Sequence, residues 1–450
     1  MRPVFPALDL FRGDTLPHEH ARELDEVDQI LCANPIVTRL VWKDLQDPED
    51  PAIDRRGRPG LSADVVLRAA LIKQMRYFSY EELAFHLADS LTYRRFCGFT
   101  CPLDVPRKSA LAKNIKRVSD VTWQKINQVI LQYAKARKVE YGRRVRIDAT
   151  VVESNIHHPT DNALLFDCVR TLARILGEAR VGFDIAYPNR RRAAKRRHME
   201  IVNAKRDTQR IKPYRKLLKI TEETIRYALR AIERLHRVSG PMAGRARRLA
   251  HELEHHIALA QQVISQTRRR VLNGESVPAE EKIVSIFEPH TDIIRKDRRD
   301  TYYGHKVTLT GGVSGLVLDW VVEEGNPADS TLLIRMLERQ HDIYGHYPLQ
   351  ASVDGGYASK ANLASAKALG VRDMVFSKKC GLKAEDMVTQ PWLFKKLRNF
   401  RAGIEGVISF LKRVFGLSRC TWSGQPSFAS YVGASIVSAN LLILARHLMS

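Results

Sequence analysis

The sequence predicts an α/β protein in which a region of alternating strands and helices is joined to two mainly helical regions. Apolar residues recur at helical spacing over about 61–138 and again over about 162–270. From residue 282 onward, short apolar runs typical of strands alternate with amphipathic runs typical of helices. Such alternation is typical of a sheet covered by helices.

Composition indicates a partner with negative charge. The chain has 450 residues, and 73 Lys and Arg against 50 Asp and Glu give a formal charge of +23. An excess of this size disfavours an acidic or neutral scaffold and points to nucleic acid first and an anionic membrane surface second. Six cysteines in so long a chain form no disulfide framework, which is typical of the reducing cytoplasm.

The N-terminal part is expected to hold an irregular region over 1–60, ending in a charged Pro/Gly linker, and a helical domain over 61–140. Ser62 is a good N-cap, and Ser79 with Glu82 forms a capping box. Short helices with a basic last helix are typical of a helix-turn-helix DNA reader. A helical bundle with a solvated basic face has the same pattern. The candidate phosphate contacts on the last helix are Arg107, Lys108 and Lys113.

A strand follows over 143–152, with apolar residues alternating around Asp148. The next stretch, 161–280, is expected to be a basic helical insertion. It carries a run of cations with no acid among them, which favours phosphate contact over a merely solvated face. These candidate DNA-binding residues are Arg190, Arg191, Arg192, Lys195, Arg196 and Arg197.

Residues 141–160 and 281–450 are expected to form one α/β domain, which the insertion interrupts. A hairpin is predicted over 305–322, and a strand over 349–353 ends at Asp354, beside two glycines. An amphipathic helix over 400–415 carries Glu405 close to its apolar face. The uncharged stretch 427–445 is long enough to cross a membrane, but its serines and glycine favour a buried helix instead.

Three acids form the candidate catalytic constellation. Asp148 lies within a strand, Asp354 follows a later parallel strand, and Glu405 lies on a helix packed on the sheet. This arrangement is that of a ribonuclease-H-like core, in which three carboxylates hold two divalent cations. Carboxylate oxygens suit Mg²⁺ or Mn²⁺. Two such ions activate an attacking oxygen and stabilise the leaving oxygen of a phosphoryl transfer.

The chain resembles the bacterial insertion-sequence DDE transposases, particularly the insertion-sequence-five-like group, over nearly its whole length from Leu61. The similar segments are Leu61-Ser-Ala-Asp-Val-Val-Leu, Phe78-Ser-Tyr-Glu-Glu-Leu, Ile147-Asp-Ala-Thr-Val-Val-Glu, Asn326-Pro-Ala-Asp and Val353-Asp-Gly-Gly-Tyr. Arg401, Glu405 and Lys412 keep the family's Tyr-x2-Arg-x3-Glu-x6-Lys spacing. Arg398 stands at the tyrosine position, a departure that bears on a contact with the transposon end and not on the metal ligands.

The resemblance implies the following roles and partners. Asp148, Asp354 and Glu405 would be the catalytic triad and the ligands of two Mg²⁺ or Mn²⁺ ions. Arg401 and Lys412 would grip the terminal DNA, with Arg398 beside them. The partners would be double-stranded DNA, as transposon ends and target, and further copies of the chain in a homodimer or larger synaptic complex. The enzyme would act in the bacterial cytoplasm, without a membrane.

Two alternatives of the same descent remain open: a DNA-binding protein that has lost cleavage, and a nuclease without strand transfer. A third pattern, His251-Glu-Leu-Glu-His255, fits the H-E-x-x-H helix of zinc peptidases. The apolar stripe of that helix is offset from the histidines, and no further ligand follows at a suitable position. These observations favour a solvated charged helix.

Overall fold

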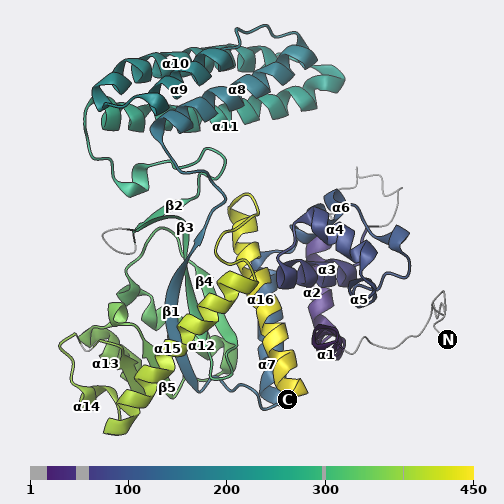
Figure 1. Ribbon diagram of the computed structural model, residues 1–450, viewed down its shortest axis with the longest axis vertical. Helices are drawn as coiled ribbons and strands as arrows, with labels where there is room; N and C mark the ends of the chain where they lie inside the picture. The colour runs from purple at the N-terminus through teal and green to yellow at the C-terminus, as the bar shows by residue number, and fades with distance from the viewer. Residues whose placement is uncertain (1–17, 47–59, 296–299, 379) are drawn as a thin grey trace, which may run out of the picture.

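The computed structural model describes residues 18–46, 60–295, 300–378 and 380–450. The described residues of the N-terminal part are mainly helical from residue 19 (Figure 1). Its elements are α1 (Glu19–Ala33), α2 (Ile36–Leu45), α3 (Ala63–Arg76), α4 (Tyr80–Asp89), α5 (Leu91–Phe96) and α6 (Lys108–Ile115). The expected caps are present, because Ser62 accepts from Val65 and Ser79 and Glu82 form a reciprocal capping box.

The expectation of an irregular region over 1–60 is corrected by α1 and α2. Leu24, Val27 and Leu31 are buried along one side of α1, at the spacing of an amphipathic helix. This helical pattern lies just before the Pro/Gly-rich stretch. The helix-breaking residues of that stretch gave the whole region an irregular composition. Most of the linker expected over 47–60 lies outside the described residues.

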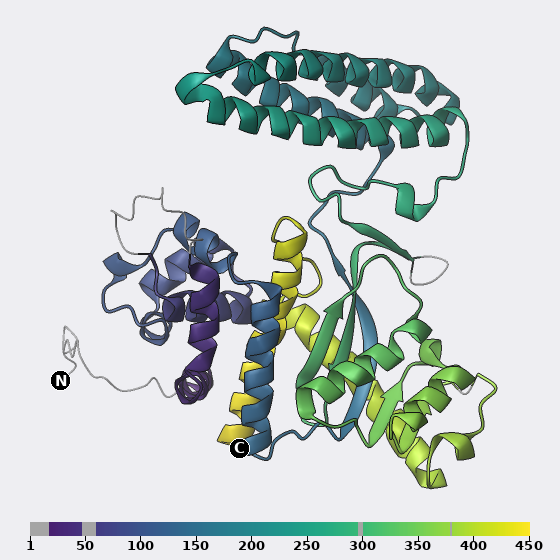
Figure 2. The same ribbon diagram turned by 180° about the vertical axis from the view of Figure 1, so that it is seen from behind.

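Two long helices connect the N-terminal helices to the sheet. They are α7 (Asp120–Ala136) and α16 (Gln425–Met449), which run side by side (Figures 1 and 2). Asn440 joins the two helices through a buried hydrogen bond to Asn127 at 2.7 Å, and it also pairs with the backbone of Val317. Helix α16 has the length and composition of a membrane span, yet 89% of its most apolar window is buried inside the protein. It is a core helix, as expected for 427–445.

A six-stranded sheet lies at the centre of the molecule. The strands are β1 (Arg144–Glu153), β2 (Asp292–Arg295), β3 (Thr301–Gly311), β4 (Val317–Val322), β5 (Gln350–Val353) and β6 (Asp373–Phe376). Their order is β2-β3-β1-β5-β6, and β4 pairs with the other end of β3. Strands β1, β5 and β6 are parallel, whereas β1–β3, β2–β3 and β3–β4 are antiparallel. This mixed sheet is the ribonuclease-H-like α/β core that the sequence predicts.

Helices cover both faces of the sheet (Figures 1 and 2). They are α12 (Leu333–Tyr344), α13 (Lys360–Ala368), α14 (Ala384–Met387) and α15 (Pro391–Val414). Helix α15 crosses β1, β5 and β6. It begins nine residues before the helix expected at Phe400, because Pro391 is favourable at a first helical position and the apolar spacing continues back through Leu397 and Leu393.

The segment between β1 and β2 forms a separate bundle (Figure 1). Its helices are α8 (Asp161–Phe183), α9 (Arg191–Asn203), α10 (Asp207–His236) and α11 (Ala243–Thr267), which share a hydrophobic core of their own. At the base of the bundle, Asp161 accepts from Arg270 at 2.9 Å, and Gln266 exchanges two hydrogen bonds with the backbone of Ile283. The first and last residues of the insertion therefore lie together.

A half-buried chain of four side chains fixes β2 and β3 to their surroundings. Glu288 pairs with His290 at 2.8 Å, His290 with His305 at 2.7 Å, and His305 with Asp292 at 2.8 Å. Three such bonds require three ring protons, whereas two neutral imidazoles carry only two. With both rings neutral, one of the three contacts therefore lacks a ring proton. Glu288 also accepts from Gly424, immediately before α16.

Candidate active site

Strand register brings the first two acids of the constellation to one level. In the parallel pair of β1 and β5, Ile147 lies opposite Val353. Asp148 and Asp354 each follow these residues by one position, so they are neighbours on strands about 4.8 Å apart and point to the same face. Asp148 lies in the middle of β1, which also pairs with β3 on its other side, and there Asp148 is opposite Leu309.

Helix α15 packs on the face of the sheet that carries these acids. The hydroxyl of Ser352 donates to the carbonyl of Leu397 at 2.9 Å, and Arg146 donates to the carbonyl of Phe400 at 3.1 Å. Gly403 has no side chain, and a Cβ there would meet the Arg146 guanidinium at 1.9 Å. The helix can therefore lie close to β1, which directs its next turn towards the two aspartates.

One guanidinium contacts all three acids. Arg401 donates from Nη1 to Glu405 Oε1 at 2.8 Å and from Nη2 to Asp148 Oδ2 at 3.0 Å. The same Nη2 lies 3.5 Å from Asp354 Oδ1. The side chains of Arg401 and Asp148 are 17% exposed, against 42% for Asp354 and 64% for Glu405. The site is thus closed towards the sheet and open on the side of Glu405.

The surroundings of Asp354 favour its ionised form. Burial by itself would raise the pKa of this carboxyl. Hydrogen bonds from the Ser377 hydroxyl, at 2.6 Å, and from the Gly355 backbone outweigh burial, together with the charges of Arg401 and Lys378. The net result is a lowered pKa, so Asp354 is a carboxylate over the whole neutral range.

The three acids suit a hard divalent cation for two reasons: their donor atoms are carboxylate oxygens, and they converge on one positive group. Among the described residues, however, no three His, Cys, Asp or Glu side chains stand ready to hold a metal ion. The guanidinium of Arg401 holds the place between the carboxylates. The hydroxyl of Tyr357 is buried without a hydrogen-bond partner near Asp148 and Asp354, and it is a polar group available to an occupant of the site.

The other residues of the expected signature lie further along α15. Arg398 is exposed on the turn before Arg401, and Lys412 is partly buried near the end of the helix. Both belong to the helix that carries Glu405, but the described contacts of Arg401 alone join the three acids.

The expected DNA-contacting cations lie on two elements that are distant from the acids (Figure 1). Arg107, Lys108 and Lys113 are exposed at α6, where Lys108 pairs with Glu81 at 2.8 Å. The run on α9 is partly neutralised, because acids lie within ion-pair distance of its two ends, Arg190 at 3.5 Å and Arg197 at 2.6 Å. The inner members, Arg191, Arg192, Lys195 and Arg196, are exposed.

Some residues around the acids were not expected from the sequence. Ser377, which donates to Asp354, follows β6, the strand beside β5. The carboxyl ends of parallel strands meet at one edge, so this adjacency was the available signal. Lys306 of β3 pairs with Asp329 and with the carbonyl of Pro327, which fixes the loop before α12 close to Tyr357.

The sheet order, and the acids that converge from the middle of β1 and the end of β5, define a ribonuclease-H-like core of the phosphoryl-transfer type. Comparison with protein families agrees with this class. The model described as Transposase domain (DUF772) matches residues 15–117, and the model described as Transposase DDE domain matches residues 276–441. The chain belongs to the DDE transposases of insertion sequences. No curated protein and no solved structure matches it significantly.

The two matched ranges leave out residues 118–275, which contain β1 and Asp148. Strand pairing closes this gap, because β1 lies between β3 and β5, and both of these strands belong to the matched DDE domain. Asp148 is therefore in the catalytic sheet by register, independently of any sequence match.

Proposed function

We propose that this transposase binds the terminal inverted repeats of its insertion sequence, cleaves the DNA there and joins the freed 3′-hydroxyl to target DNA. The observation that carries the proposal is the convergence of Asp148, Asp354 and Glu405 on the guanidinium of Arg401. Three carboxylates from two strands and a helix gather around one cation in a protein of net charge +23. A structural ion pair requires only one of them.

In this proposal the three acids bind Mg²⁺ or Mn²⁺, two ions in the reacting complex. When bound, such ions activate the attacking oxygen and stabilise the leaving oxygen of an in-line transfer. Asp354, with its lowered pKa, is a ready anionic ligand, and Ser377 fixes the direction of its carboxylate. Arg401 must leave at least part of its present position, and a DNA phosphate is the natural acceptor for its two terminal nitrogens.

The basic surfaces supply the remaining parts of the proposal. Arg398 and Lys412 would contact the transposon end beside the acids, and α6 would contact DNA at a recognition site within the helical domain assigned to 61–140. The exposed cations of α9 would bind phosphates further along the duplex. Two ends must be brought together, so we expect a homodimer or a larger synaptic complex, acting in the bacterial cytoplasm.

The test is cleavage of a labelled duplex that carries the element's own terminal repeat and flanking DNA. We compare the wild type with Glu405→Gln and with Glu385→Gln, a matched change at an exposed glutamate of α14. Cutting at the repeat boundary is expected in Mg²⁺ or Mn²⁺ and not in EDTA. Glu405→Gln should lose it by about 10³-fold or more while still binding the duplex, and Glu385→Gln should not.

Each of the other outcomes would indicate a different function for this protein. Specific binding without cutting in the wild type would indicate a DNA-binding protein that has lost cleavage. Cutting without joining of the 3′-hydroxyl to a target plasmid would indicate a nuclease. Equal activity of the wild type and Glu405→Gln would refute the assignment of the acids.

A further inference from the structure

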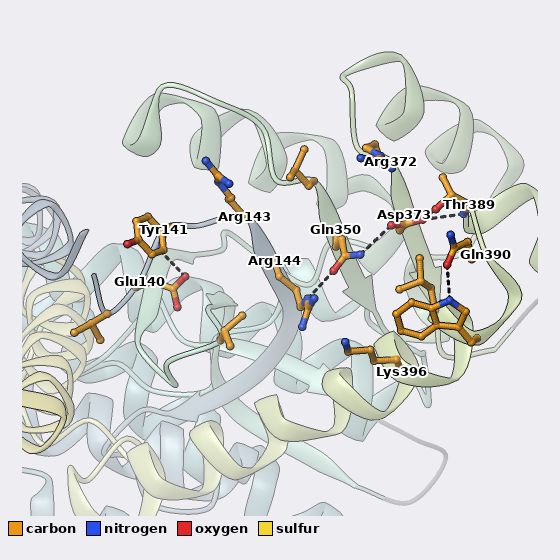
Figure 3. Close-up of a pocket in the computed structure, with 15 residues that line it drawn as sticks. Glu140, Tyr141, Arg143, Arg144, Gln350, Arg372, Asp373, Thr389, Gln390 and Lys396 are labelled. Carbon is orange, nitrogen blue, oxygen red and sulfur yellow. Dashed lines mark hydrogen bonds between the residues drawn. The ribbon is translucent and has the colours of Figure 1, made fainter. Parts of the chain in front are cut away.

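A basic cleft lies where strands β1, β5 and β6 begin (Figure 3). Its cavity of about 630 Å³ is lined by the first residues of β1, β5 and β6 and by the start of α15. Arg144 and Asp148 are four residues apart on β1, which separates the cleft from the acids by about 13 Å along the strand. Arg144 is thus part of the cleft and not of the catalytic constellation.

Within the described residues, the cations of the cleft form no ion pairs with its own two acids. Asp373 is 3% exposed and accepts from Thr389 and Gln350. Glu140 is also 3% exposed, and it accepts from backbone groups and from a serine hydroxyl. Both acids are thus buried, and the hydrogen bonds that they accept come from neutral groups.

Four cations remain around the opening: Arg143, Arg144, Arg372 and Lys396. Figure 3 shows the hydrogen-bonded series Arg144–Gln350–Asp373–Thr389 as the floor of the cleft, with Arg143 and Arg372 on one side and Lys396 on the other. Within the described part of the chain, no acid pairs with Arg143 or Arg372, and both are exposed. The surface therefore attracts an anion from two sides.

An exposed aromatic side chain accompanies these cations. Trp392, in the first turn of α15, is 56% exposed, and its ring nitrogen is fixed by Gln390 at 2.5 Å. The ammonium of Lys396 lies 5.1 Å from the centre of the ring. Tyr141, which also lines the cavity, is 42% exposed. An exposed indole ring beside a cation is a combination that binds unpaired bases, because bases stack on the ring while phosphates contact Arg and Lys.

We infer that this cleft binds single-stranded DNA, one or two nucleotides of it, with a base on Trp392 and phosphates at Arg143 and Arg372. The size of the cavity favours a single strand over a duplex, since only an unpaired base can reach the face of the indole. Unpaired strands arise wherever a transposon end is opened. The choice of DNA as ligand rests on the proposed function, but the cleft shares no residue with the catalytic acids.

The test uses the full-length protein in EDTA with a fluorescent twelve-nucleotide oligo-dT. Lys396→Glu is compared with Lys395→Glu, the neighbouring exposed lysine that does not line the cavity. We expect Lys396→Glu to weaken binding about tenfold and to reduce the salt dependence, and Lys395→Glu to weaken it much less. Trp392→Ala should weaken binding about fivefold or more, and Trp392→Phe should restore most of it.

Photo-crosslinking locates the site directly. Oligo-dT that contains 5-iododeoxyuridine should crosslink to the peptide with Trp392 or Tyr141, and crosslinks only elsewhere would overturn the inference. Equal losses for Lys395→Glu and Lys396→Glu, or equally strong competition by poly-glutamate of the same charge, would show charge attraction without a nucleotide site. Glu405→Gln should bind the oligonucleotide normally, so a failure of catalysis and a failure of this cleft are separable.

Discussion

A buried lysine beside α16 provides a quantitative test of the packing between the N-terminal helices and the rest of the protein. Lys73 of α3 is 3% exposed. Its ammonium lies 4.9 Å from the ring centre of Tyr80 and 5.8 Å from that of Trp422, and no carboxylate within the described chain pairs with it. Desolvation, helped by the charge of Lys116, lowers the pKa of Lys73 to about 8.

The lowered pKa predicts that the charge of Lys73 destabilises the folded protein at neutral pH. The unfolded chain holds this proton up to about pH 10.5, whereas the folded chain releases it near 8. The difference amounts to at most about 3 kcal/mol below pH 8 and disappears as the pH rises to the unfolded value.

We therefore expect Lys73→Met, which keeps the length of the side chain and removes the charge, to stabilise the protein by up to about 3 kcal/mol at pH 7. The gain should decrease by about 2 kcal/mol between pH 7 and pH 9.5. Denaturant unfolding followed by circular dichroism at both pH values measures it, with Lys113→Met on the exposed side of α6 as the control. A destabilised Lys73→Met, or a gain that does not change with pH, would refute the reasoning.

Three further predictions concern the acids and the sheet. Arg401→Gln removes the cation between the acids and should raise the affinity for Mn²⁺ about tenfold in the absence of DNA. The electron paramagnetic resonance signal of free Mn²⁺ measures this affinity. A weaker affinity in the variant would mean that the guanidinium positions the ligands. Burial, with the charge of His305, lowers the pKa of His290, so stability should decrease as the pH falls below about 6.5, and His290→Gln should flatten this profile in thermal unfolding. Gly304→Ala would place a Cβ 2.0 Å from the carbonyl of Val152, and it should cost about 3 kcal/mol or more in the same assay; a neutral effect would contradict the strand pairing.

The sequence predicts the sheet and the position of its acids well, because periodicity and strand ends are local properties. Asp148 lies within a strand and Asp354 at the end of another, and the parallel pairing of these two strands is enough to bring the two acids together. The four-residue spacing of Arg401 and Glu405 also predicts their contact on one helix face. The contacts of Arg401 with the two aspartates could not be predicted, since they depend on how α15 crosses the sheet.

Other features lie beyond sequence reasoning for the same reason. Lysine is ordinarily a surface residue, yet Lys73 is buried because the segment before α16, from the far end of the chain, packs against α3. The pairing of Glu288 with Gly424 likewise joins residues 136 positions apart. Tertiary contacts of this kind decide which charges are buried, and no local pattern reports them.

The position of the α8–α11 bundle explains how a large insertion and an intact central sheet can coexist. The insertion separates β1 from β2 in the sequence, and β1 is the central strand that carries Asp148. A long flexible connection would add loop-closure entropy to every pairing of β1 with β3. The Asp161–Arg270 ion pair and the Gln266–Ile283 hydrogen bonds bring the two ends of the insertion together. The entropy cost of pairing β1 with β3 is therefore that of a short connection. The bundle can therefore carry basic residues far from the acids without loosening the strand on which the proposed catalysis depends.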